Sequence, residues 1–344
     1  MTPGIGIIGT GMVGQMCHLA NFAANPAGRV IAIADLRPEL AAAAAQKFGV
    51  SRIYGTHREL LADSEVSAVV VVTKRRATGP IVLDVLNSGS HVLSEKPMAY
   101  TTAQAETLVE AARRQDLIYS IGYMEASRCR RGTRVAELAR IRADRSLGRI
   151  VAAHGWCFGG DTGRAQDNFV MTAEARPDGL ELWEDGPDWM PRAMRQGYDH
   201  FLNASSHIIN VVRYLLGPSP TLLDSSIEGS GAGRITLDFD GLACTLDLTS
   251  GSAGPWREGL TVEFERGAMT LELPPPFAEQ EALVVVDHDG QRMQTAGAPS
   301  WAFRRQADAF VSDVARRRTP LASGADSVTD IALAEAVWKR RVSG

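Results

Sequence analysis

The chain has 344 residues, of which 45% are hydrophobic and 22% charged, a composition typical of a globular protein with room for two domains. A formal net charge of −4 without a long basic run disfavours nucleic-acid binding, and no apolar run is long enough to cross a membrane. The first residues lead straight into a predicted strand without a basic leader, so we expect a cytoplasmic protein with no membrane partner.

A glycine turn follows the first apolar run of the chain. The run at residues 5–8 ends in a G-x-G-x-x-G pattern made by Gly9, Gly11 and Gly14, and a helical pattern follows. Such glycines permit a tight strand-to-helix turn and let a pyrophosphate approach the backbone at the helix N-terminus. The candidate phosphate-binding stretch is Gly9-Thr10-Gly11-Met12-Val13-Gly14.

A carboxylate closes the second apolar run, at residues 30–34. Asp35 lies 21 positions after Gly14, where this fingerprint expects an acid that accepts hydrogen bonds from the adenosine ribose. Its alternative role is to cap the helix predicted at residues 39–48, but the strand, the turn and the spacing together favour the ribose. A carboxylate here repels a 2′-phosphate, so it favours NAD over NADP, although Arg37 could partly offset that repulsion.

Strands and helices then alternate, which predicts a doubly wound parallel sheet with right-handed crossovers. Ligands of such sheets bind outside the carboxyl ends of the strands. Thr73 follows one of these strands and Glu95-Lys96-Pro97 follows the next. The predicted strands are 67–72, 91–94 and 117–121, and the predicted helices are 79–87 and a helix capped by Thr101 that ends at residue 114.

Lys96 is a candidate catalytic residue because of its position. A lysine that follows a buried strand and precedes a proline is held close to the cofactor crevice, and partial burial lowers a lysine pKa toward the range useful for proton transfer. The alternative is a salt-bridged surface lysine in a turn. The position at the carboxyl end of the strand favours the first interpretation.

These motifs together resemble the Gfo/Idh/MocA family of oxidoreductases, named after glucose–fructose oxidoreductase and inositol dehydrogenase. The resemblance rests on the glycine turn, Asp35 and Glu95-Lys96-Pro97, and it extends through Gly122-Tyr123-Met124 and Arg128 into the second half. It implies an NAD(P)-dependent enzyme acting on sugars, cyclitols or their derivatives. It also implies a catalytic Lys96. From their positions beside the turn and at the strand ends, we further expect Arg37, Thr73, Glu95 and Lys96 to contribute to the nucleotide site.

The second half changes to a period of two, which predicts a mostly antiparallel sheet with one buried face. The resemblance implies that the other face forms a subunit interface, so we expect a homodimer or homotetramer. The four cysteines lack the spacing of a metal site or a disulfide framework, and no metal is expected. The predicted elements are a helix at 131–143, strands at 149–157, 242–248, 260–264 and 269–273, hairpin turns at 240–241, 266–267 and 289–290, and closing helices at 301–317 and 327–341.

The helix predicted at residues 199–216 carries a polar stripe along an apolar surface. His200, Asn203, His207 and Asn210 recur at spacings of three and four residues. From the residues alone, such a stripe either satisfies the interior or lines a binding site, and the first alternative is the commoner. The family resemblance favours the second, with Asn203 at a position where relatives carry an acid. Asn203 can bind a hydroxyl but cannot accept its proton.

We therefore predict a dinucleotide-binding domain at residues 1–122 and a substrate and oligomerisation domain at residues 123–344. The predicted reaction is hydride transfer between a secondary alcohol of a sugar, cyclitol or glycoside and NAD, with Lys96 and His207 catalytic. One alternative is an enzyme that recycles tightly bound NAD, and another is a non-catalytic sugar or nucleotide sensor. The predicted substrate-binding residues are Tyr123, Arg128, Asn203 and Asn210.

Overall fold

The computed structural model describes residues 2–125, 140–141, 145–163, 168–176, 178–249, 251, 254–296 and 301–343. The chain forms two compact units. Unit 1 comprises Met1–Tyr123, Gln166–Asp185 and Phe303–Val328, and unit 2 comprises Met124–Ala165, Gly186–Ala302 and Thr329–Gly344. Two segments from the second half of the chain thus join unit 1, and the division into domains at residues 122 and 123 stays a prediction.

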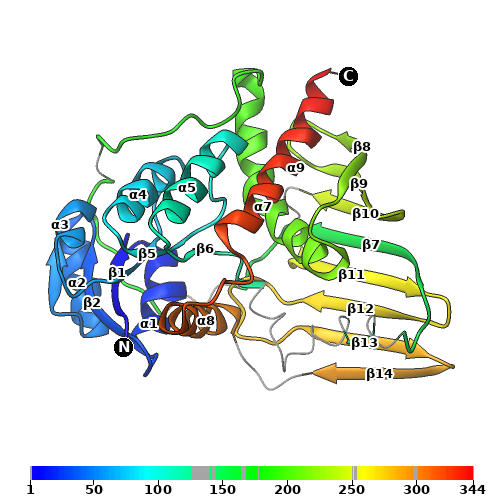
Figure 1. The fold of residues 1–344 in the computed structure, drawn as a ribbon, viewed down its shortest axis with the longest axis horizontal. Coiled ribbons are helices and arrows are strands. Elements are labelled where there is room, and N and C mark those ends of the chain that lie inside the picture. The colour runs from blue at the N-terminus through cyan, green and yellow to red at the C-terminus, as the bar shows by residue number, and fades with distance from the viewer. Residues whose placement is uncertain are drawn as a thin grey trace. The chain divides into compact units, whose positions relative to one another are not determined.

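Unit 1 is built on a parallel six-stranded sheet in the order β3-β2-β1-β4-β5-β6. Helices lie on both sides of it, with α4 and α5 on one side and α1 and α8 on the other (Figure 1). The strands are β1 (Gly4–Ile8), β2 (Arg29–Ala34), β3 (Arg52–Tyr54), β4 (Ala68–Val71), β5 (His91–Ser94) and β6 (Tyr119–Ile121). The helices are η1 (Gly14–Leu19), α1 (Ala20–Ala23), α2 (Pro38–Phe48), α3 (His57–Leu61), α4 (Arg75–Asn87), α5 (Thr102–Arg114) and α8 (Ala302–Arg316).

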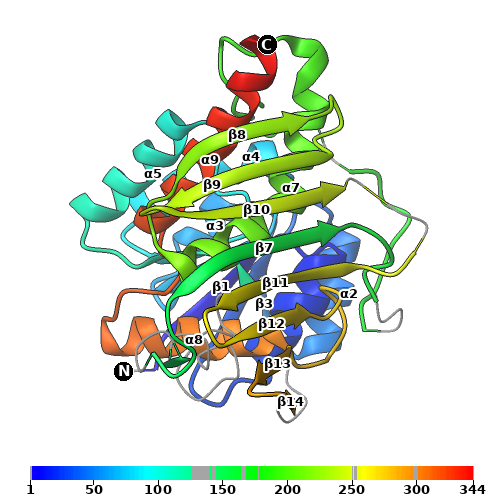
Figure 2. The ribbon, with the colours of Figure 1, turned by 90° about the vertical axis from the view of Figure 1, so that its right-hand side faces the viewer.

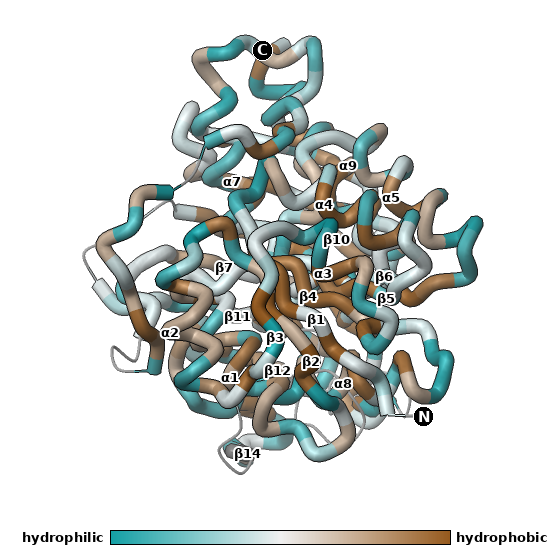
Figure 3. The backbone as a smooth tube through the Cα atoms, turned by 90° about the vertical axis from the view of Figure 1, so that its left-hand side faces the viewer, coloured by the Kyte–Doolittle hydropathy of each residue, from teal (hydrophilic) through white to brown (hydrophobic). Residues whose placement is uncertain are grey.

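One face of this sheet packs into a single apolar core. Alternate residues of the strands cluster with side chains of η1, α1, α2 and α8, and the hydrophobic colouring of β1, β2 and β4 is clear in Figure 3. The strand order and the helices on both faces are those of a doubly wound sheet, as predicted. The strand residues of this cluster include Ile5, Ile7, Ile33, Val70 and Leu93.

Two short elements of unit 1 are absent from the sequence prediction. Neither β3 nor α3 contains enough residues to show a period. A local signal for α3 is nevertheless present, because Thr56 and Glu59 form a capping box. The Thr56 Oγ1 atom accepts from the N–H of Glu59 at 3.2 Å, and the Glu59 carboxylate accepts from the N–H of Thr56 at 2.9 Å.

Helix α4 begins at Arg75, before the start predicted near residue 79, and it contains Gly79 and Pro80. The missing N–H of Pro80 leaves the carbonyl of Arg76 without its helical donor. That carbonyl accepts instead from the N–H of Trp183 at 3.0 Å, and the Trp183 indole lies where a Cβ atom on Gly79 would be, 2.2 Å from its nearest ring carbon. The Gly79-Pro80 pair therefore forms a docking place for Trp183 inside unit 1.

Unit 2 contains an eight-stranded sheet in the order β14-β13-β12-β11-β7-β10-β9-β8. Only β7 and β10 pair in parallel, so the sheet is mostly antiparallel, as predicted. Helix α7 (Arg192–Leu216) packs behind it against β7 and β11 (Figure 2). The strands are β7 (Ile150–Phe158), β8 (Thr221–Ile227), β9 (Gly233–Phe239), β10 (Leu242–Thr249), β11 (Arg257–Phe264), β12 (Gly267–Leu273), β13 (Leu283–His288) and β14 (Gln291–Ala296).

Two of the predicted hairpin turns, at 240–241 and 289–290, occur where the sequence indicates them, whereas the third lies at residues 265–266 and Gly267 already begins β12. Asp240 and Gly241 both have positive φ angles between β9 and β10, and Asp289 and Gly290 do so between β13 and β14. Helix α9 (Gly324–Ser343) begins in unit 1 and ends in unit 2. The predicted helix at 131–143 lies outside the described residues except at positions 140–141, which are helical. None of the helices described is both long and apolar enough to span a bilayer.

A buried ion pair joins α7 to α9 within unit 2. The guanidinium of Arg213 donates to Asp330 Oδ1 at 2.7 Å, and the amide of Asn210 donates to Asp330 Oδ2 at 3.0 Å. The side chains of Arg213 and Asp330 are 2% and 1% exposed. Because a buried charge is tolerated only when it is paired and hydrogen-bonded, these three side chains depend on one another.

We expect Asp330→Ala to lower the free energy of unfolding by about 3–5 kcal/mol, because it leaves the Arg213 guanidinium buried without its carboxylate. Urea unfolding followed by circular dichroism measures the effect. Glu110→Ala is the control, since it removes an exposed pair with Arg113 and should change the midpoint little. Equal midpoints for the two variants would show that the buried pair does not stabilise unit 2.

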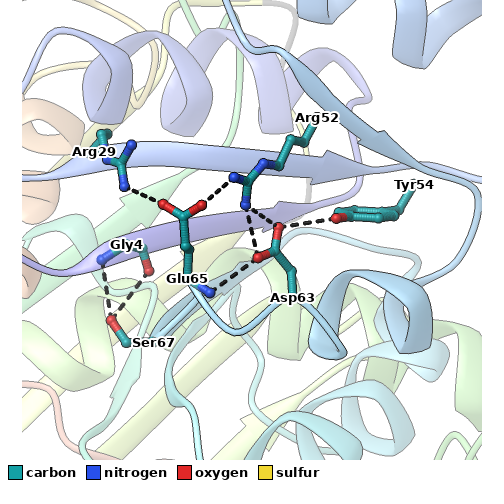
Figure 4. Close-up of polar contacts among 7 residues, drawn as sticks. All are labelled: Gly4, Arg29, Arg52, Tyr54, Asp63, Glu65 and Ser67. Atoms are coloured by element: carbon teal, nitrogen blue, oxygen red, sulfur yellow. Dashed lines mark hydrogen bonds and ion pairs between the residues drawn. The ribbon is translucent and has the colours of Figure 1, made fainter.

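A charged cluster ties β2 and β3 of unit 1 to the connection between α3 and β4 (Figure 4). The Arg52 guanidinium donates to both oxygens of Asp63, at 2.9 and 2.8 Å, and also to Glu65. The hydroxyl of Tyr54 donates to Asp63 at 3.0 Å, and Arg29 donates to Glu65 at 2.6 Å. The hydrogen bonds from Arg52 are the main reason that the pKa of Asp63 lies below its ordinary value.

The lowered pKa of Asp63 predicts an acid-sensitive contribution to stability. Its carboxylate stabilises the fold above the unfolded pKa of about 3.9, and this contribution is lost as the pH falls through the lower folded value. Asp63→Asn should therefore lower the thermal midpoint near pH 7, and the difference from wild type should shrink near about pH 2.5. Asp178→Asn, at an exposed position, is the control. A deficit that is equally large at both pH values would contradict the interpretation.

Candidate functional site

The glycine turn in unit 1 has two glycines that the fold requires and one that faces open space. A Cβ atom on Gly9, whose φ is +93°, would lie 2.1 Å from the carbonyl oxygen of Val72, and one on Gly14 would lie 2.1 Å from that of Gly9. The nearest atom to a Cβ on Gly11 would be a guanidinium nitrogen of Arg37 at 3.9 Å. Gly11 thus leaves room in front of the turn, as a pyrophosphate would require.

The helix after the turn is wound as a π-helix from Gly14 to Leu19, whereas the sequence predicts an ordinary helical pattern there. This winding accompanies the burial of two polar side chains, Gln15 and His18, at 0% and 1% exposure. The amide of Gln15 donates to the carbonyl oxygens of Thr10 at 2.6 Å and Val170 at 2.9 Å. Its oxygen accepts from the N–H of Val170 at 2.9 Å, so Gln15 ties the turn to a distant segment.

Asp35 follows β2 and faces the glycine turn. Its Oδ2 accepts from the N–H and the hydroxyl of Thr10 at 2.8 and 2.9 Å, and its Oδ1 accepts from the N–H of Arg37 at 3.0 Å. The Arg37 guanidinium donates to both oxygens at 3.0 Å. Burial raises the pKa of Asp35, but these hydrogen bonds outweigh it and the pKa lies below its ordinary value.

The alternative role of Asp35, as the N-cap of the following helix, is wrong. The N-cap residue of α2 is Arg37, and no side chain of its own first turn caps it. The cap comes from Glu174, whose two carboxylate oxygens accept from the N–H groups of Glu39 at 3.1 Å and Leu40 at 2.7 Å. Asp35 is therefore left to organise Thr10 and Arg37 beside the turn.

Glu95 and Lys96 follow β5, and the Lys96–Pro97 peptide bond is cis. One oxygen of Glu95 lies 2.7 Å from Nε2 of His18, and the other accepts from the N–H of Lys96 at 3.2 Å. His18 also packs edge-on against the ring of Phe303. His18, which the sequence prediction does not include, thus connects the helix after the glycine turn to the backbone that presents Lys96.

Two other predicted residues of unit 1 lie at the same carboxyl edge of the sheet. Thr73 follows β4, and its hydroxyl is 3.2 Å from that of Thr78 in the first turns of α4. Tyr123 follows β6 and is almost fully buried. The remaining residues of the turn, Met12 and Val13, are half-buried at the start of the helix.

In unit 2, the polar stripe of α7 enters different surroundings along its length. His200 is exposed, Asn203 is half-buried, and His207 and Asn210 are buried. The amide nitrogen of Asn210 is engaged by Asp330, as described above. The predicted substrate residue Arg128 lies outside the described residues.

Comparison with known proteins identifies the class to which residues 4–123 belong. Residues 4–123 match the family GFO_IDH_MocA, described as an oxidoreductase family with an NAD-binding Rossmann fold. This part of the chain is therefore a nucleotide-binding domain of the Gfo/Idh/MocA family, which confirms the resemblance of its motifs.

Two curated relatives act on sugars or cyclitols, as their names state. Levoglucosan dehydrogenase of Pseudarthrobacter phenanthrenivorans is 24% identical over 226 residues, which cover 62% of this chain and 51% of that protein. Inositol 2-dehydrogenase of Salmonella typhimurium is 28% identical over 165 residues, covering 47% and 48%. The chain thus spans about half the length of the curated relatives it matches.

Solved structures share the fold over nearly the whole chain. A 3-ketoreductase from Actinomadura kijaniata in complex with NADP and TDP-benzene has a TM-score of 0.75 at 19% identity, with 98% of each chain covered. Levoglucosan dehydrogenase in complex with NADH and levoglucosan has a TM-score of 0.76 at 17% identity, with 98% and 97% covered. One neighbour carries NADP and the other NADH, so the fold is compatible with either nucleotide.

We expect Gly11→Ala to weaken NAD binding by at least about tenfold while leaving the thermal midpoint unchanged, because the added methyl enters open space that a pyrophosphate would fill. Calorimetric titration with NAD and a thermal melt measure the two effects. Gly14→Ala is the contrasting variant, since its methyl meets the Gly9 carbonyl and should lower the midpoint itself. Undiminished NAD affinity in Gly11→Ala would contradict the placement of the phosphate at this turn.

Proposed function

We propose that this protein is an NAD-dependent oxidoreductase that acts on a secondary alcohol of a sugar, cyclitol or glycoside. One observation carries the proposal. In unit 1, the glycine turn follows β1, Asp35 follows β2 and Lys96 follows β5, all at the carboxyl edge of one parallel sheet. A dinucleotide bound at the turn would extend along this edge toward Lys96. The names of the relatives support the substrate class.

In this proposal the nucleotide takes the hydride, and the residues of the chain handle the proton and the charge on the oxygen. NAD, when bound, accepts the hydride from the carbinol carbon. His207 accepts the hydroxyl proton, a task suited to the imidazole ring of a histidine. The ammonium of Lys96 stabilises the negative charge that develops on the oxygen. Asn203, which cannot take a proton, orients the hydroxyl by hydrogen bonding.

The other proposed substrate residues have more limited roles. Arg128 and Tyr123 position the substrate in our proposal, as the family resemblance implies. For Asn210, the hydrogen bond to Asp330 supports a role in holding α7 rather than a direct contact with substrate. For the cofactor, the Asp35 carboxylate supports NAD over NADP.

We also propose that unit 2 forms a homodimer or homotetramer through the face of its sheet opposite α7. Figure 2 shows the strands of this face uncovered by the described helices. Its side chains make polar contacts with one another, since His154 and Arg234 both contact Asp247, and the hydroxyls of Thr261 and Thr270 lie 3.1 Å apart. The substrate and cofactor proposals do not depend on this assembly.

The activity is tested by mixing the protein with NAD or NADP and a panel of sugars, inositols and glycosides, and following absorbance of the reduced nicotinamide. With the best substrate, Lys96→Met should lower kcat by about 10²- to 10⁴-fold and leave the Kd for NAD within about twofold. The surface substitution Lys47→Met is the control and should keep wild-type kcat.

Two results would count against this assignment. Full turnover in Lys96→Met would remove the lysine from the catalytic step. If wild-type protein binds NAD but produces no reduced nicotinamide with any member of the panel, the proposed dehydrogenase activity itself is wrong.

A further inference from the structure

A segment from the second half of the chain crosses the nucleotide-binding edge of unit 1. We call residues 168–176 and 178–185 the strap. Although the strap falls within the predicted substrate domain at residues 123–344, it belongs to unit 1. Its contacts with the rest of the unit include those of Val170, Glu174, Trp183, Glu184 and Asp185.

Each contact of the strap falls near the N-terminus of a helix. Val170 is bound by Gln15 at the start of η1, and Glu174 by the first turn of α2. Trp183 docks on Arg76 and Gly79 in α4, and the carbonyl of Glu184 accepts from Gln104 in the first turn of α5 at 3.0 Å. In a parallel doubly wound sheet these helix N-termini lie at the carboxyl edge of the strands, where the dinucleotide binds. The strap therefore crosses that edge.

Glu174 occupies the position of an anion within this edge. Its carboxylate caps α2 through the N–H groups of Glu39 and Leu40, and the hydroxyl of Thr172 donates to it at 3.1 Å. Desolvation raises the pKa of Glu174, but these hydrogen bonds and the nearby charge of Arg37 hold it below its ordinary value. At neutral pH the start of α2 is thus already satisfied by a side-chain anion.

The start of α2 lies beside Asp35 and Arg37, the residues that in this fold distinguish NAD from NADP. In this fold the acid after the second strand binds the ribose 2′-hydroxyl of NAD, and a nearby arginine accommodates the 2′-phosphate of NADP. Here Arg37 is the arginine, and its guanidinium is already shared with both oxygens of Asp35. Two carboxylates, Asp35 and Glu174, against one guanidinium leave a net charge of −1, which repels a phosphate.

We propose that Glu174 is a specificity-determining residue of the nucleotide site and excludes the 2′-phosphate. The strap carries this carboxylate to the start of α2, where a phosphate would otherwise accept the free N–H groups and the charge of Arg37. This proposal rests on the proposed nucleotide function and goes beyond it, because it assigns the choice of cofactor to a residue far from the glycine turn and from Asp35 in the sequence.

The test measures binding without turnover, with two fragments of the cofactors as probes. Adenosine 2′,5′-bisphosphate carries the 2′-phosphate and 5′-AMP does not. We expect Glu174→Ala to tighten binding of the bisphosphate at least about tenfold by calorimetry, and to change the Kd for 5′-AMP by no more than about twofold. Glu181→Ala removes the same charge from an exposed position of the strap and should change neither Kd.

Glu174→Gln guards against a loosened strap, because the amide oxygen can still accept a backbone hydrogen bond while the charge is removed. It should also tighten bisphosphate binding. An unchanged bisphosphate Kd in both Glu174 variants would overturn the role of Glu174, as would an equal gain in Glu181→Ala. If wild-type protein bound neither 5′-AMP nor NAD, both the proposed nucleotide function and the role of Glu174 would be wrong. If it bound 5′-AMP and NAD but the Glu174 variants left the bisphosphate Kd unchanged, only the role of Glu174 would be wrong.

Discussion

Two buried side chains on one short helix hold the nucleotide-binding edge of unit 1 together. Gln15 binds the carbonyl of Thr10 and both backbone groups of Val170, so it links the glycine turn to the strap. His18 contacts Glu95, which in turn accepts from the backbone of Lys96. Both side chains are buried, so neither can be lost without leaving polar groups unsatisfied. Hydrogen bonds through these two side chains therefore link the glycine turn to the strap and to the backbone of Lys96.

The strap also attaches to α4 at two residues that are unfavourable inside a helix. Pro80 inside α4 removes a backbone donor, and Gly79 removes a side chain, both of which weaken an isolated helix. Trp183 compensates for both, because its N–H binds the carbonyl that Pro80 leaves free and its indole covers Gly79. The Gly79-Pro80 pair thus serves the attachment of the strap.

The sequence predicts those features that depend on neighbours in the chain. The glycine turn, the spacing of Asp35, the Thr101 cap, the period-two strands and the Asp-Gly turns all follow from local stereochemistry. Such patterns predict the strands of unit 1 other than β3, and β7, β10, β11 and β12 of unit 2. The cap of α2 could not be predicted in this way, because its acceptor, Glu174, is more than 130 residues away. The same holds for His18, whose partner Glu95 is brought near only by the parallel order of β1, β4 and β5. Local patterns locate the site, and long-range contacts decide how its charges are arranged.

The polar stripe of helix α7 combines a residue that holds the helix in place with residues proposed to act on the substrate. His207 and Asn210 are three residues apart and share a face, so a helical period groups them in one stripe. Asp330, which lies in a helix 120 residues further along the chain, separates them by binding Asn210 together with Arg213. A buried guanidinium needs a carboxylate, and that carboxylate has a second oxygen to satisfy, which the Asn210 amide does. The place of Asn210 in the stripe is thus explained by the demands of one buried charge, whereas the roles of Asn203 and His207 in the chemistry stay a proposal.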